Sequence, residues 1–518
     1  MQDGAADDGV SLGGPVGAAV LAVAVSLVLL VFKLAFFPSL DPREPPLARP
    51  RVPFVGHILG LIKESASYYA RLHKRTRLPI CTLPMLNGKL YLINSPSLIS
   101  AAMRNRDLSF DPFAVEFSVK LLDIEEKWYR AWMEPGWYQS MTDVIHASLT
   151  GENLRVMKAA CYRELAATLN GYDQTIEIKN AYDWLALIVP RAFNKALFGA
   201  QHNPMTDEAI QAIWDFDQGV AVMSYNLFPR LLAPKALAAR SLLQKTLLPY
   251  YAAGYYKGDD VSALIRGRAI KVLGEDGTPE LLAKTEMNLP WAAVTNTVPD
   301  LFWLVSNIFS RPHVLERFRA EVGEVMTLSS DDENGGRRGV IDAGVLIERP
   351  YLAATYWEVH RIYNEALGNR RVTRDTTIAD PADGGREYFL KKGTNVQWAV
   401  GPPHRDTAVW GDDAEVFRPE RWVEASAAQE RAQNRSMFPF GGGRNLCPGK
   451  AFAISESLAL VAVLAVGFEL DGVRLPASTP PLVSAAMRRP YFGKGDWGFK
   501  LSRRRGWEDV TWSFKLDS

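Results

Sequence analysis

The pattern in this sequence that is best suited to chemistry is one cysteine at the end of a glycine-rich stretch. Residues 438–450 read Phe-Pro-Phe-Gly-Gly-Gly-Arg-Asn-Leu-Cys-Pro-Gly-Lys, and an apolar helical pattern begins directly after them. A thiolate at Cys447 would face loop N–H groups and the positive end of the following helix, and both would lower its pKa. An anionic sulfur suits a metal, and a single cysteine axial ligand is what haem-thiolate chemistry needs. The alternative is a free cysteine in a surface turn.

The spacing around Cys447 makes the pattern specific. Phe440 stands seven residues before it, Gly443 stands four before it, and Gly449 follows two after it. An aromatic ring at that distance can lie against the sulfur, and glycines let the backbone pass close to a flat ring. The stretch resembles the haem-binding loop of the cytochrome P450 family. The resemblance implies that haem b is the cofactor, that Cys447 is the axial ligand of its iron, and that the other three residues contact it.

Basic side chains hold the haem propionates in this family. A basic residue commonly stands two before the cysteine, whereas here Asn445 occupies that place and Arg444 stands three before it. Arg370 or Arg371 is a second candidate, and we select Arg371. Many members of the family also carry a tryptophan and an arginine on the helix equivalent to the one around residue 146. We do not find that pair, so His146 is the candidate substitute, and the alternative is a helical histidine without a ligand.

A second candidate for chemistry is the long apolar helical pattern that contains residues 291–303. Pro299 removes one helical N–H, so the carbonyl of Thr295 loses its partner. A kink with a free carbonyl and the polar side chains of Thr295, Asn296 and Thr297 could hold dioxygen or water, and these three are our candidate catalytic residues. In most of the family an acid and a threonine occupy this turn and relay protons. Here Thr295 falls at the acid position and Asn296 at the threonine position.

This departure resembles one branch of the family. Asn-Thr-x-Pro followed by Phe-Trp is similar to the branch that contains the sterol 7α- and 12α-hydroxylases, prostacyclin synthase and related enzymes of fungal secondary metabolism. Within that branch asparagine is compatible with hydroxylation and with redox-neutral rearrangement. Asn296 cannot donate a proton as an acid does, so we expect it to orient water. The alternative is a proline kink with polar side chains and no catalytic role.

Three charged residues form the candidate scaffold beneath the haem. Glu358 and Arg361 are three residues apart, which places them on one helix face as a natural bidentate pair. Arg421, in the segment Phe-Arg-Pro-Glu-Arg-Trp, can join them as a third member. The family uses such a Glu–Arg–Arg cluster to lock its fold. We therefore expect structural rather than chemical roles for all three.

Length and composition restrict the class of protein. The chain has 518 residues, 47% of them hydrophobic, and a net charge of +1, which describes an ordered protein with no global attraction to nucleic acid. Its three cysteines, Cys81, Cys161 and Cys447, form no disulfide framework, which favours a reducing compartment. No dinucleotide-binding glycine motif is present, so we expect reducing equivalents to come from a partner.

The N-terminal region has the pattern of a membrane anchor. Residues 10–32 are uncharged and long enough to span a bilayer, with acidic residues before them and basic residues after them. We predict a lumenal N-terminus at 1–9, a transmembrane anchor at 10–37, a proline-rich linker at 38–56 and a cytosolic catalytic domain at 57–518. The predicted location is the endoplasmic reticulum membrane, with a single pass. A cleaved signal peptide is the alternative.

The elements that must position these residues are mostly helical. Residues 79–94 alternate and turn at Asn87-Gly88, which predicts a β-hairpin. From about 96 to 320 the periodicity is helical, except that 111–124 carries aromatic residues without a clear period. The tail, 474–515, has strand-like pieces. The predicted fold class is mainly α with a small β portion. The resemblance implies the cytochrome P450 fold, preceded by one N-terminal transmembrane helix.

The implied function is that of a haem-dependent monooxygenase. It would insert one oxygen atom from O2 into a lipophilic substrate, such as a terpenoid, a sterol or another secondary metabolite. Electrons would come from NADPH through NADPH–cytochrome P450 reductase, with cytochrome b5 as a further candidate donor. One alternative is a redox-neutral haem-thiolate isomerase or dehydratase that acts on an oxygenated lipid or peroxide. Another is a non-enzymatic haem-binding sensor.

Overall fold

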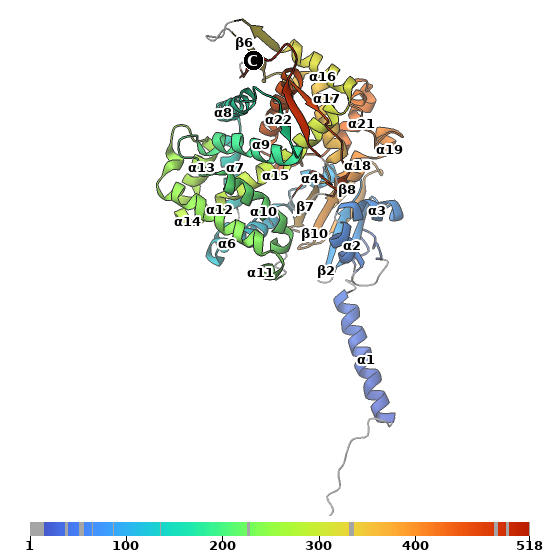
Figure 1. Ribbon diagram of the computed structural model, residues 1–518. Coiled ribbons are helices and arrows are strands. Elements are labelled where there is room, and N and C mark those ends of the chain that lie inside the picture. The colour runs from blue at the N-terminus through green and yellow to red at the C-terminus, as the bar shows by residue number, and fades with distance from the viewer. Residues whose placement is uncertain are drawn as a thin grey trace, which may run out of the picture.

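Helices form most of the computed structural model, in agreement with the predicted fold class (Figure 1). The structure describes residues 15–36, 40–50, 56–64, 66–85, 88–134, 136–224, 228–330, 336–480, 485–493 and 497–516. The predicted lumenal residues 1–9, part of the predicted anchor, Asn87 and part of the proline-rich linker lie outside these ranges. The predicted lumenal segment and the ends of the linker therefore remain sequence-based predictions.

The helical region that the periodicity predicts is present as a series of α-helices. The segment with scattered aromatic residues, which the periodicity does not assign, is also a helix, α5. In chain order these helices are α4 (Pro96–Arg104), α5 (Asp111–Leu122), α6 (Glu126–Trp132), α7 (Trp137–Ser148), α8 (Gly151–Asn170), α9 (Ala181–Phe198), α10 (Asp207–Ser224), α11 (Pro229–Leu232), α12 (Pro234–Ala252), α13 (Ala263–Leu273), α14 (Pro279–Glu286), α15 (Asn288–Phe309) and α16 (Pro312–Glu324).

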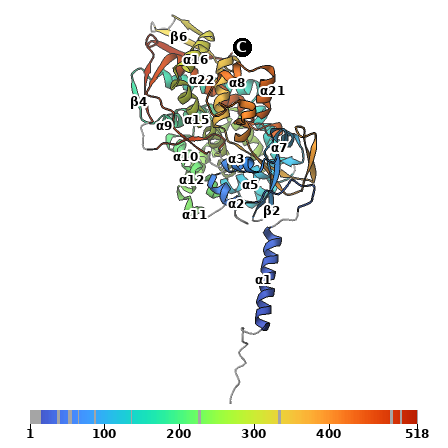
Figure 2. The same ribbon diagram turned by 90° about the vertical axis from the view of Figure 1, so that its right-hand side faces the viewer.

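Two helices that are apolar on nearly all sides form the centre of the core. They are α15 and α22 (Lys450–Gly467), and they pack against each other and against α17 (Pro350–Tyr363) or α8. A helix that is hydrophobic all round is stable only when it is surrounded by protein or lipid. Both views show α15 and α22 inside the body, with other helices around them (Figures 1 and 2). The chain between α17 and α22 contains the short helices α18 (Gly401–His404), α19 (Thr407–Trp410), α20 (Glu420–Val423) and α21 (Ala427–Ser436).

The largest sheet begins with the predicted hairpin, which the structure confirms. Strands β1 (Ile80–Met85) and β2 (Gly88–Ile93) pair antiparallel, with Ile80 opposite Ile93. The sheet order is β1-β2-β10-β7-β3, where the other strands are β10 (Asn395–Ala399), β7 (Leu367–Val372) and β3 (Leu108–Ser109). Helices α2 (Gly56–Glu64) and α3 (Ala66–Thr76) pack beside this sheet. Strand β7 matters for the site because it carries two of the candidate arginines.

Four smaller sheets complete the fold, and they contain more strands than the sequence predicts. The first is β11-β14-β4, built from β11 (Phe468–Asp471), β14 (Phe499–Arg503) and β4 (Ile176–Ile178). The pair β12 (Ser478–Thr479) and β13 (Arg489–Pro490) and the pair β8 (Thr376–Asp380) and β9 (Arg386–Leu390) are the next two. The last is β15-β6-β5, with β15 (Val510–Lys515), β6 (Arg337–Asp342) and β5 (Met326–Ser329). In it the C-terminal strand pairs in parallel with β6, which fixes the tail on the body.

A single helix projects from the body where the sequence predicts an anchor. It is α1 (Pro15–Phe36), and it stands apart from every other element in both views (Figures 1 and 2). Among the described helices, only α22 meets the length and apolarity of a membrane span, and most of it is buried in the core. The described apolar stretch of α1, Gly17–Leu30, is shorter. The N-terminal transmembrane helix is therefore not confirmed, and it stays a prediction.

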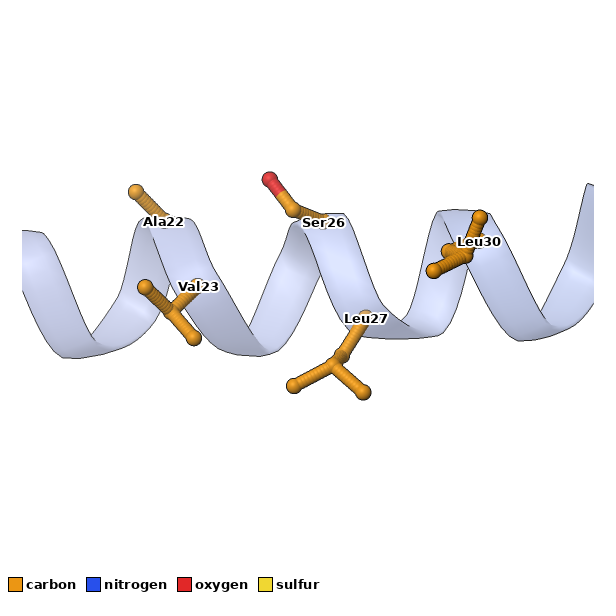
Figure 3. Close-up of a pocket in the computed structure, with 5 residues that line it drawn as sticks. All are labelled: Ala22, Val23, Ser26, Leu27 and Leu30. Atoms are coloured by element: carbon orange, nitrogen blue, oxygen red, sulfur yellow. The ribbon is translucent and has the colours of Figure 1, made fainter.

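The concavity drawn in Figure 3 is a feature of the α1 surface. Ala22, Val23, Ser26, Leu27 and Leu30 line it, and all five come from one isolated helix. Because one helix cannot enclose a small molecule, this concavity does not have the shape of a substrate site.

Candidate functional site

The loop that carries Cys447 is folded tightly against helix α4. The Cys447 N–H donates to the Phe440 carbonyl at 2.9 Å, which closes the loop across the glycines. Gly443 has a φ of +61°, and a Cβ there would lie 2.2 Å from the Met103 carbonyl oxygen. A side chain at this position would therefore be strained and would collide with α4. The close approach that requires a glycine at 443 is thus to the backbone of α4.

The thiol of Cys447 receives the predicted donors, but its pKa moves in the direction opposite to the prediction. Backbone N–H groups of Gly449 and Lys450 and the Lys450 charge favour the thiolate, yet burial outweighs them and raises the pKa. The prediction of a thiolate held by the loop alone is therefore wrong, because the sequence gives no measure of desolvation. A buried thiol with donors aimed at it is suited to a metal cation, which deprotonates a coordinating thiol outright.

Cys447 is accessible within its loop. The residue is exposed, although protein surrounds it closely enough that burial raises the pKa of its thiol. One face of the central helix α15 has the same character, because Ala292 is exposed and Ala293 and Asn296 are half-buried, whereas their helical neighbours are buried. Ala292 and Ala293 each lie about one helical turn before Asn296, so the three share one side of the helix. This face of α15 is therefore not fully covered by a neighbouring element.

Asn296 is the predicted catalytic residue whose side chain lies on this face. Its Oδ1 accepts a hydrogen bond from the Ala486 N–H at 2.8 Å. Since a backbone N–H requires an acceptor, this contact fixes the orientation of the amide. The Asn296 NH2 group then remains as a donor, and it has no hydrogen-bond partner among the residues that the structure describes. Asn296 also ties α15 to the segment 485–490 of the C-terminal region.

Unlike the Asn296 amide, the hydroxyl groups of Thr295 and Thr297 bond within α15. The Thr295 hydroxyl donates to the Trp291 carbonyl and the Thr297 hydroxyl donates to the Ala293 carbonyl, each at 2.9 Å. Both residues are buried, and both contacts are the i to i−4 pattern by which a threonine bonds within its own helix. Of the three candidates, only Asn296 therefore lies on the half-open face of α15, the face formed by Ala292, Ala293 and Asn296. The catalytic roles of all three candidates remain predictions.

Of the two neighbouring arginines on β7, the structure favours Arg370 rather than Arg371 as an anion ligand. Arg371 forms an ion pair with Glu116 of α5 at 2.5 Å. Arg370 is 5% exposed and lies over the rings of Phe110 and Trp398, and it has no carboxylate at ion-pair distance within the described part of the chain. Burial lowers the pKa of Arg370 to about 10, and the neighbouring Arg444 acts in the same direction. A buried guanidinium without a paired anion is the group that a propionate would satisfy.

His146 lies near the end of α7 without a described partner for its ring. The residue of α7 that lies near Arg370 is Tyr138, since the Arg370 charge acts against the burial that raises the pKa of Tyr138 to about 12. Eight residues separate Tyr138 from His146, which is about 12 Å along the helix axis. The structure therefore does not bring His146 to the arginine pair. Trp137, the tryptophan on this helix, donates to Glu275 at 2.5 Å instead.

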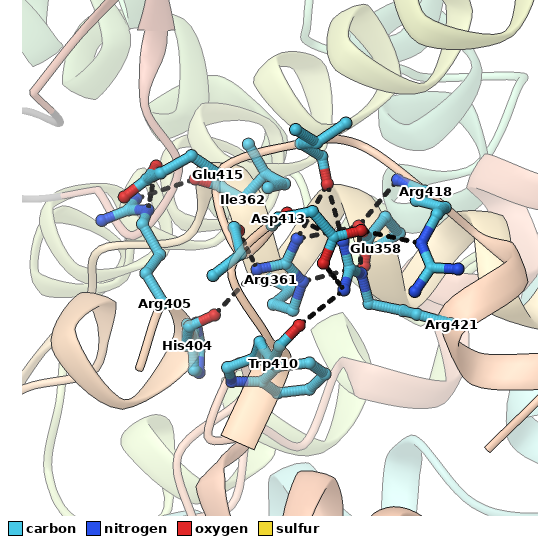
Figure 4. Close-up of polar contacts among 12 residues, drawn as sticks. Glu358, Arg361, Ile362, His404, Arg405, Trp410, Asp413, Glu415, Arg418 and Arg421 are labelled. Carbon is cyan, nitrogen blue, oxygen red and sulfur yellow. Dashed lines mark hydrogen bonds and ion pairs between the residues drawn. The ribbon is translucent and has the colours of Figure 1, made fainter. Parts of the chain in front are cut away.

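The predicted scaffold residues meet in a fully paired buried cluster (Figure 4). Arg361 contacts both Glu358 oxygens, at 2.9 and 2.8 Å, and Arg421 contacts Glu358 at 3.0 Å. The Glu358 carboxylate also accepts hydrogen bonds from the Trp422 indole and from the Arg418 N–H. The remaining guanidinium donors reach carbonyl groups and Asp413; these partners are His404 O, Ala414 O, Trp410 O, Val416 O, Asp413 O and Asp413 Oδ1. Side chains and carbonyls from four short segments are thereby joined at one carboxylate.

The polar groups of Cys447, Arg370 and Asn296 fit a haem. Cys447 offers a sulfur with two N–H groups that favour its thiolate, Arg370 offers a guanidinium without a described carboxylate at ion-pair distance, and Asn296 offers an amide on the half-open face of α15. These are the groups that an axial ligand, a propionate partner and a distal polar residue require. No cluster of three or more His, Cys, Asp and Glu side chains that could hold a metal ion occurs among the described residues.

Comparisons with known proteins agree with this site. A family model described as Cytochrome P450 matches residues 45–482. A cytochrome P450 monooxygenase of Gibberella zeae is 31% identical over 512 residues, 96% of each chain, and a cytochrome P450 monooxygenase of Hypoxylon pulicicidum is 25% identical over 509 residues, 96% of this chain and 97% of the relative. Cytochrome P450 52A8 of Candida tropicalis is 30% identical over 206 residues, 39% of this chain and 38% of the relative. The match over nearly the whole chain, together with the Cys447 loop and its Glu–Arg–Arg scaffold, means that this chain belongs to the cytochrome P450 family of haem-dependent monooxygenases.

Proposed function

We propose that this enzyme inserts one oxygen atom from O2 into a lipophilic substrate, such as a terpenoid, a sterol or another secondary metabolite. The observation that carries the proposal is the Cys447 loop, whose backbone N–H groups and Lys450 charge favour a thiolate, and the half-open face of α15 around Asn296 adds a polar group to it. A haem held by Cys447 would supply oxygen activation, because a thiolate ligand donates electron density that favours O–O cleavage. Arg370 and Arg444 would bind its propionates.

Asn296 is the residue of this chain that would act on the distal side. Its oxygen is engaged by the Ala486 N–H, so its NH2 group faces the reaction as a fixed donor. A fixed amide can orient a water molecule and bias proton delivery, although it cannot release a proton as an acid does. We therefore assign Asn296 the role of positioning water, while Thr295 and Thr297 shape the helix turn beside it.

The surroundings of α15 support an apolar substrate. Trp291 stacks on Phe117 with ring centroids 6.3 Å apart and meets Phe216 edge-on at 5.7 Å. Its indole N–H donates to Asp217 at 2.8 Å, so the ring is held in one orientation. These packed aromatic rings make the surroundings of α15 apolar, which favours an apolar molecule over a small polar one.

Exposed cationic side chains support docking of NADPH–cytochrome P450 reductase, or of cytochrome b5, on the side of the haem loop. Arg104 in α4 and Arg435 in α21 are exposed, and α4 packs against both α21 and the haem loop. A positive surface of this kind attracts an acidic partner, with a strength that falls as salt rises.

Apolar side chains at the end of the body nearest α1 support a membrane-bound arrangement. Phe228 beside α11 is 77% exposed, and Leu231, Leu232 and Leu59 of α2 are also exposed. Helices α2 and α11 lie at the end of the body from which α1 projects (Figure 1). Exposed apolar patches mark sites of membrane or protein contact. We accordingly propose a single-pass anchor at 10–37, a linker at 38–56 and a catalytic domain at 57–518 on the cytosolic face of the endoplasmic reticulum.

The test uses the full chain in detergent or vesicles, with haem, reductase and NADPH. A panel of sterols and terpenoids should give products that are heavier by one oxygen atom, and ¹⁸O2 should label that atom. Omission of reductase or NADPH should abolish the product. Consumption of NADPH without a labelled product from any lipophilic substrate would contradict the proposal.

A redox-neutral isomerase or dehydratase that acts on an oxygenated lipid or peroxide is the second candidate. It is favoured by α15 itself, whose single acidic residue, Asp300, is buried, so that Thr295 stands where an acid is usual and the amide of Asn296 stands where a threonine is usual. Turnover of a lipid hydroperoxide or endoperoxide at the same rate with and without NADPH would support this candidate over the first.

A further inference from the structure

A buried acid and a buried imidazole face each other between the central helix and the haem loop. Asp300 of α15 is 3% exposed and His360 of α17 is 4% exposed, and the Asp300 Oδ1 lies 3.4 Å from the His360 Nε2. The Ser457 hydroxyl of α22 donates to the other carboxyl oxygen at 3.2 Å, and the Tyr356 hydroxyl also bonds to this carboxyl group. Three helices thus meet at Asp300, one turn beyond Asn296.

Neighbouring amides fix the tautomer of His360. The Asn364 Oδ1 accepts from the Ala366 N–H, so the Asn364 Nδ2 must be the donor. That Nδ2 lies 3.5 Å from the His360 Nδ1, which therefore acts as the acceptor. The proton of the neutral ring is then on Nε2, which lies 3.4 Å from the Asp300 Oδ1, and neither of these two buried atoms has a hydrogen-bond partner among the described residues. Burial raises the pKa of Asp300 to about 8 and lowers that of His360 to about 3, so neither group is fully charged at neutral pH.

The same residues hold the first half of the haem loop. The Asn364 Nδ2 donates to the Pro439 carbonyl at 3.0 Å, and the Phe438 N–H donates to the His404 Nε2 at 3.0 Å. The His360 ring lies against the Phe440 ring with centroids 5.0 Å apart. The Phe440 carbonyl in turn accepts from the Cys447 N–H. Only one residue, Phe440, therefore separates His360 from the sulfur ligand.

We propose that Asp300 and His360 are positioning residues for Cys447: Asp300 orients the His360 ring, which fixes Phe440 and through it the place of the sulfur. This inference rests on the proposed role of Cys447 as the haem ligand. Through the contacts from Asp300 to His360 and from His360 to Phe440, the central helix α15 would be connected to the loop that carries the haem ligand. Outer partners of a metal ligand change affinity or activity by about 10–100-fold when they are removed.

The test compares Asp300→Asn, His360→Phe and the double variant in the full haem-loaded chain. His360→Phe keeps a ring against Phe440 but removes the Nε2 donor. Each single variant should release haem to a scavenger protein about 10–100-fold faster, and should shift its reduced carbon monoxide spectrum toward the form that lacks the thiolate bond. The double variant should be no worse than the worse single variant, because both changes cut the same connection.

The matched control is Glu456→Gln. Glu456 of α22 is also buried, its pKa is also raised to about 8, and its described contact is with Cys161 rather than with the loop. This control should keep the haem and the spectrum of the unmodified protein. If Asp300→Asn and His360→Phe match Glu456→Gln in both measurements, the positioning role is overturned. An unmodified protein without the thiolate spectrum would overturn the proposed function instead.

A milder variant covers the case in which Asp300→Asn does not fold. Ser457→Ala removes one donor to Asp300 and leaves the His360 contact in place. It should accelerate haem release by about threefold, with an unchanged circular dichroism spectrum, since one neutral hydrogen bond contributes about 1 kcal/mol or less. An unchanged release rate for Ser457→Ala would count against the connection.

Discussion

The two buried charge clusters around the haem loop differ in how completely their groups are paired. In the Glu358 cluster the carboxylate meets two guanidinium groups, an indole and a backbone N–H, and the guanidinium donors reach carbonyl groups. In the Asp300 cluster the contact between acid and imidazole is long, and burial holds both groups near neutrality. A fully paired cluster is a rigid scaffold, whereas a cluster near neutrality can change its charge. We therefore expect mutations in the first cluster to act on folding and those in the second to act on the site.

The largest effect should come from the paired cluster. Glu358→Gln leaves two buried guanidinium groups without their carboxylate, and breaking a buried pair in this way costs about 3–5 kcal/mol. We expect a strongly lowered yield of folded protein and a lower temperature of unfolding, measured by circular dichroism. Glu424→Gln, an exposed acid at the end of α20, is the control and should unfold as the unmodified protein does. A stable Glu358→Gln protein would remove the distinction between the clusters.

A smaller effect should separate Arg370 from Arg371. Arg370→Met removes a buried charge that has no described carboxylate partner, so the protein without haem should not be destabilised. The haem-loaded protein should lose its cofactor about 10–100-fold faster, because an outer partner of the haem is missing. Arg371→Met should instead affect stability through the lost pair with Glu116, with a smaller change in haem release. Haem transfer kinetics and thermal unfolding of both forms measure the difference, and the reverse order would restore Arg371 as the ligand.

The Asp300 cluster also predicts a pH dependence of stability. Burial raises the pKa of Asp300 and of Glu456 to about 8, so the folded chain retains two protons that the unfolded chain releases. The two carboxyl groups contribute fully to the free energy of unfolding below about pH 4, and this contribution is lost as pH rises toward 8. The His360 imidazole has the opposite effect on stability. Because burial lowers its pKa from 6.5, the folded state loses stability as pH falls below 6.5, and above that pH His360 has no effect. The unopposed window therefore runs from pH 6.5 to 8.

Across that window each carboxyl group should contribute a loss of about 2 kcal/mol, since one proton changes the free energy of unfolding by about 1.4 kcal/mol per pH unit. Asp300→Asn and Glu456→Gln should each remove about half of the slope in unfolding experiments across pH. Glu430→Gln, an exposed acid on α21, should leave the slope unchanged. A slope that is the same in all four proteins would mean that neither buried carboxyl group retains its proton.

The smallest effect should come from the threonines beside Asn296. Thr295→Val and Thr297→Val remove hydroxyls that bond within α15, so turnover should change by less than about threefold. Asn296→Ala should reduce turnover far more, because it frees the Ala486 segment and removes the fixed donor. Steady-state kinetics with one substrate measure both. If Thr297→Val and Asn296→Ala lowered turnover equally, the Thr297 hydroxyl would take part in the reaction.

Short motifs made the scaffold and the haem loop predictable. The i, i+3 spacing of Glu358 and Arg361 decides their pairing within one helix, and the glycines around Cys447 define its loop before any tertiary contact is known. The hairpin and the helical body follow from local periodicity in the same way. These predictions succeeded because the residues involved are close in sequence.

The rest depended on tertiary contacts. Arg370 and Arg371 point to opposite faces of β7, and only the position of α5 decides which of them meets Glu116. Asp300 and His360 are on different helices, and no motif connects them. The raised pKa of Cys447 reflects burial, which the sequence does not report. The prediction of His146 rests only on the missing Trp and Arg pair, and no sequence signal indicates Tyr138.

The central claim is that the Cys447 sulfur binds the iron of a haem. The measurement that tests it most directly is the absorption spectrum of the reduced, carbon monoxide-treated full chain, taken beside that of Cys447→Ser. The account predicts the band of a thiolate-ligated haem in the unmodified protein and its loss in Cys447→Ser. A Cys447→Ser protein that keeps both the band and the turnover would contradict it.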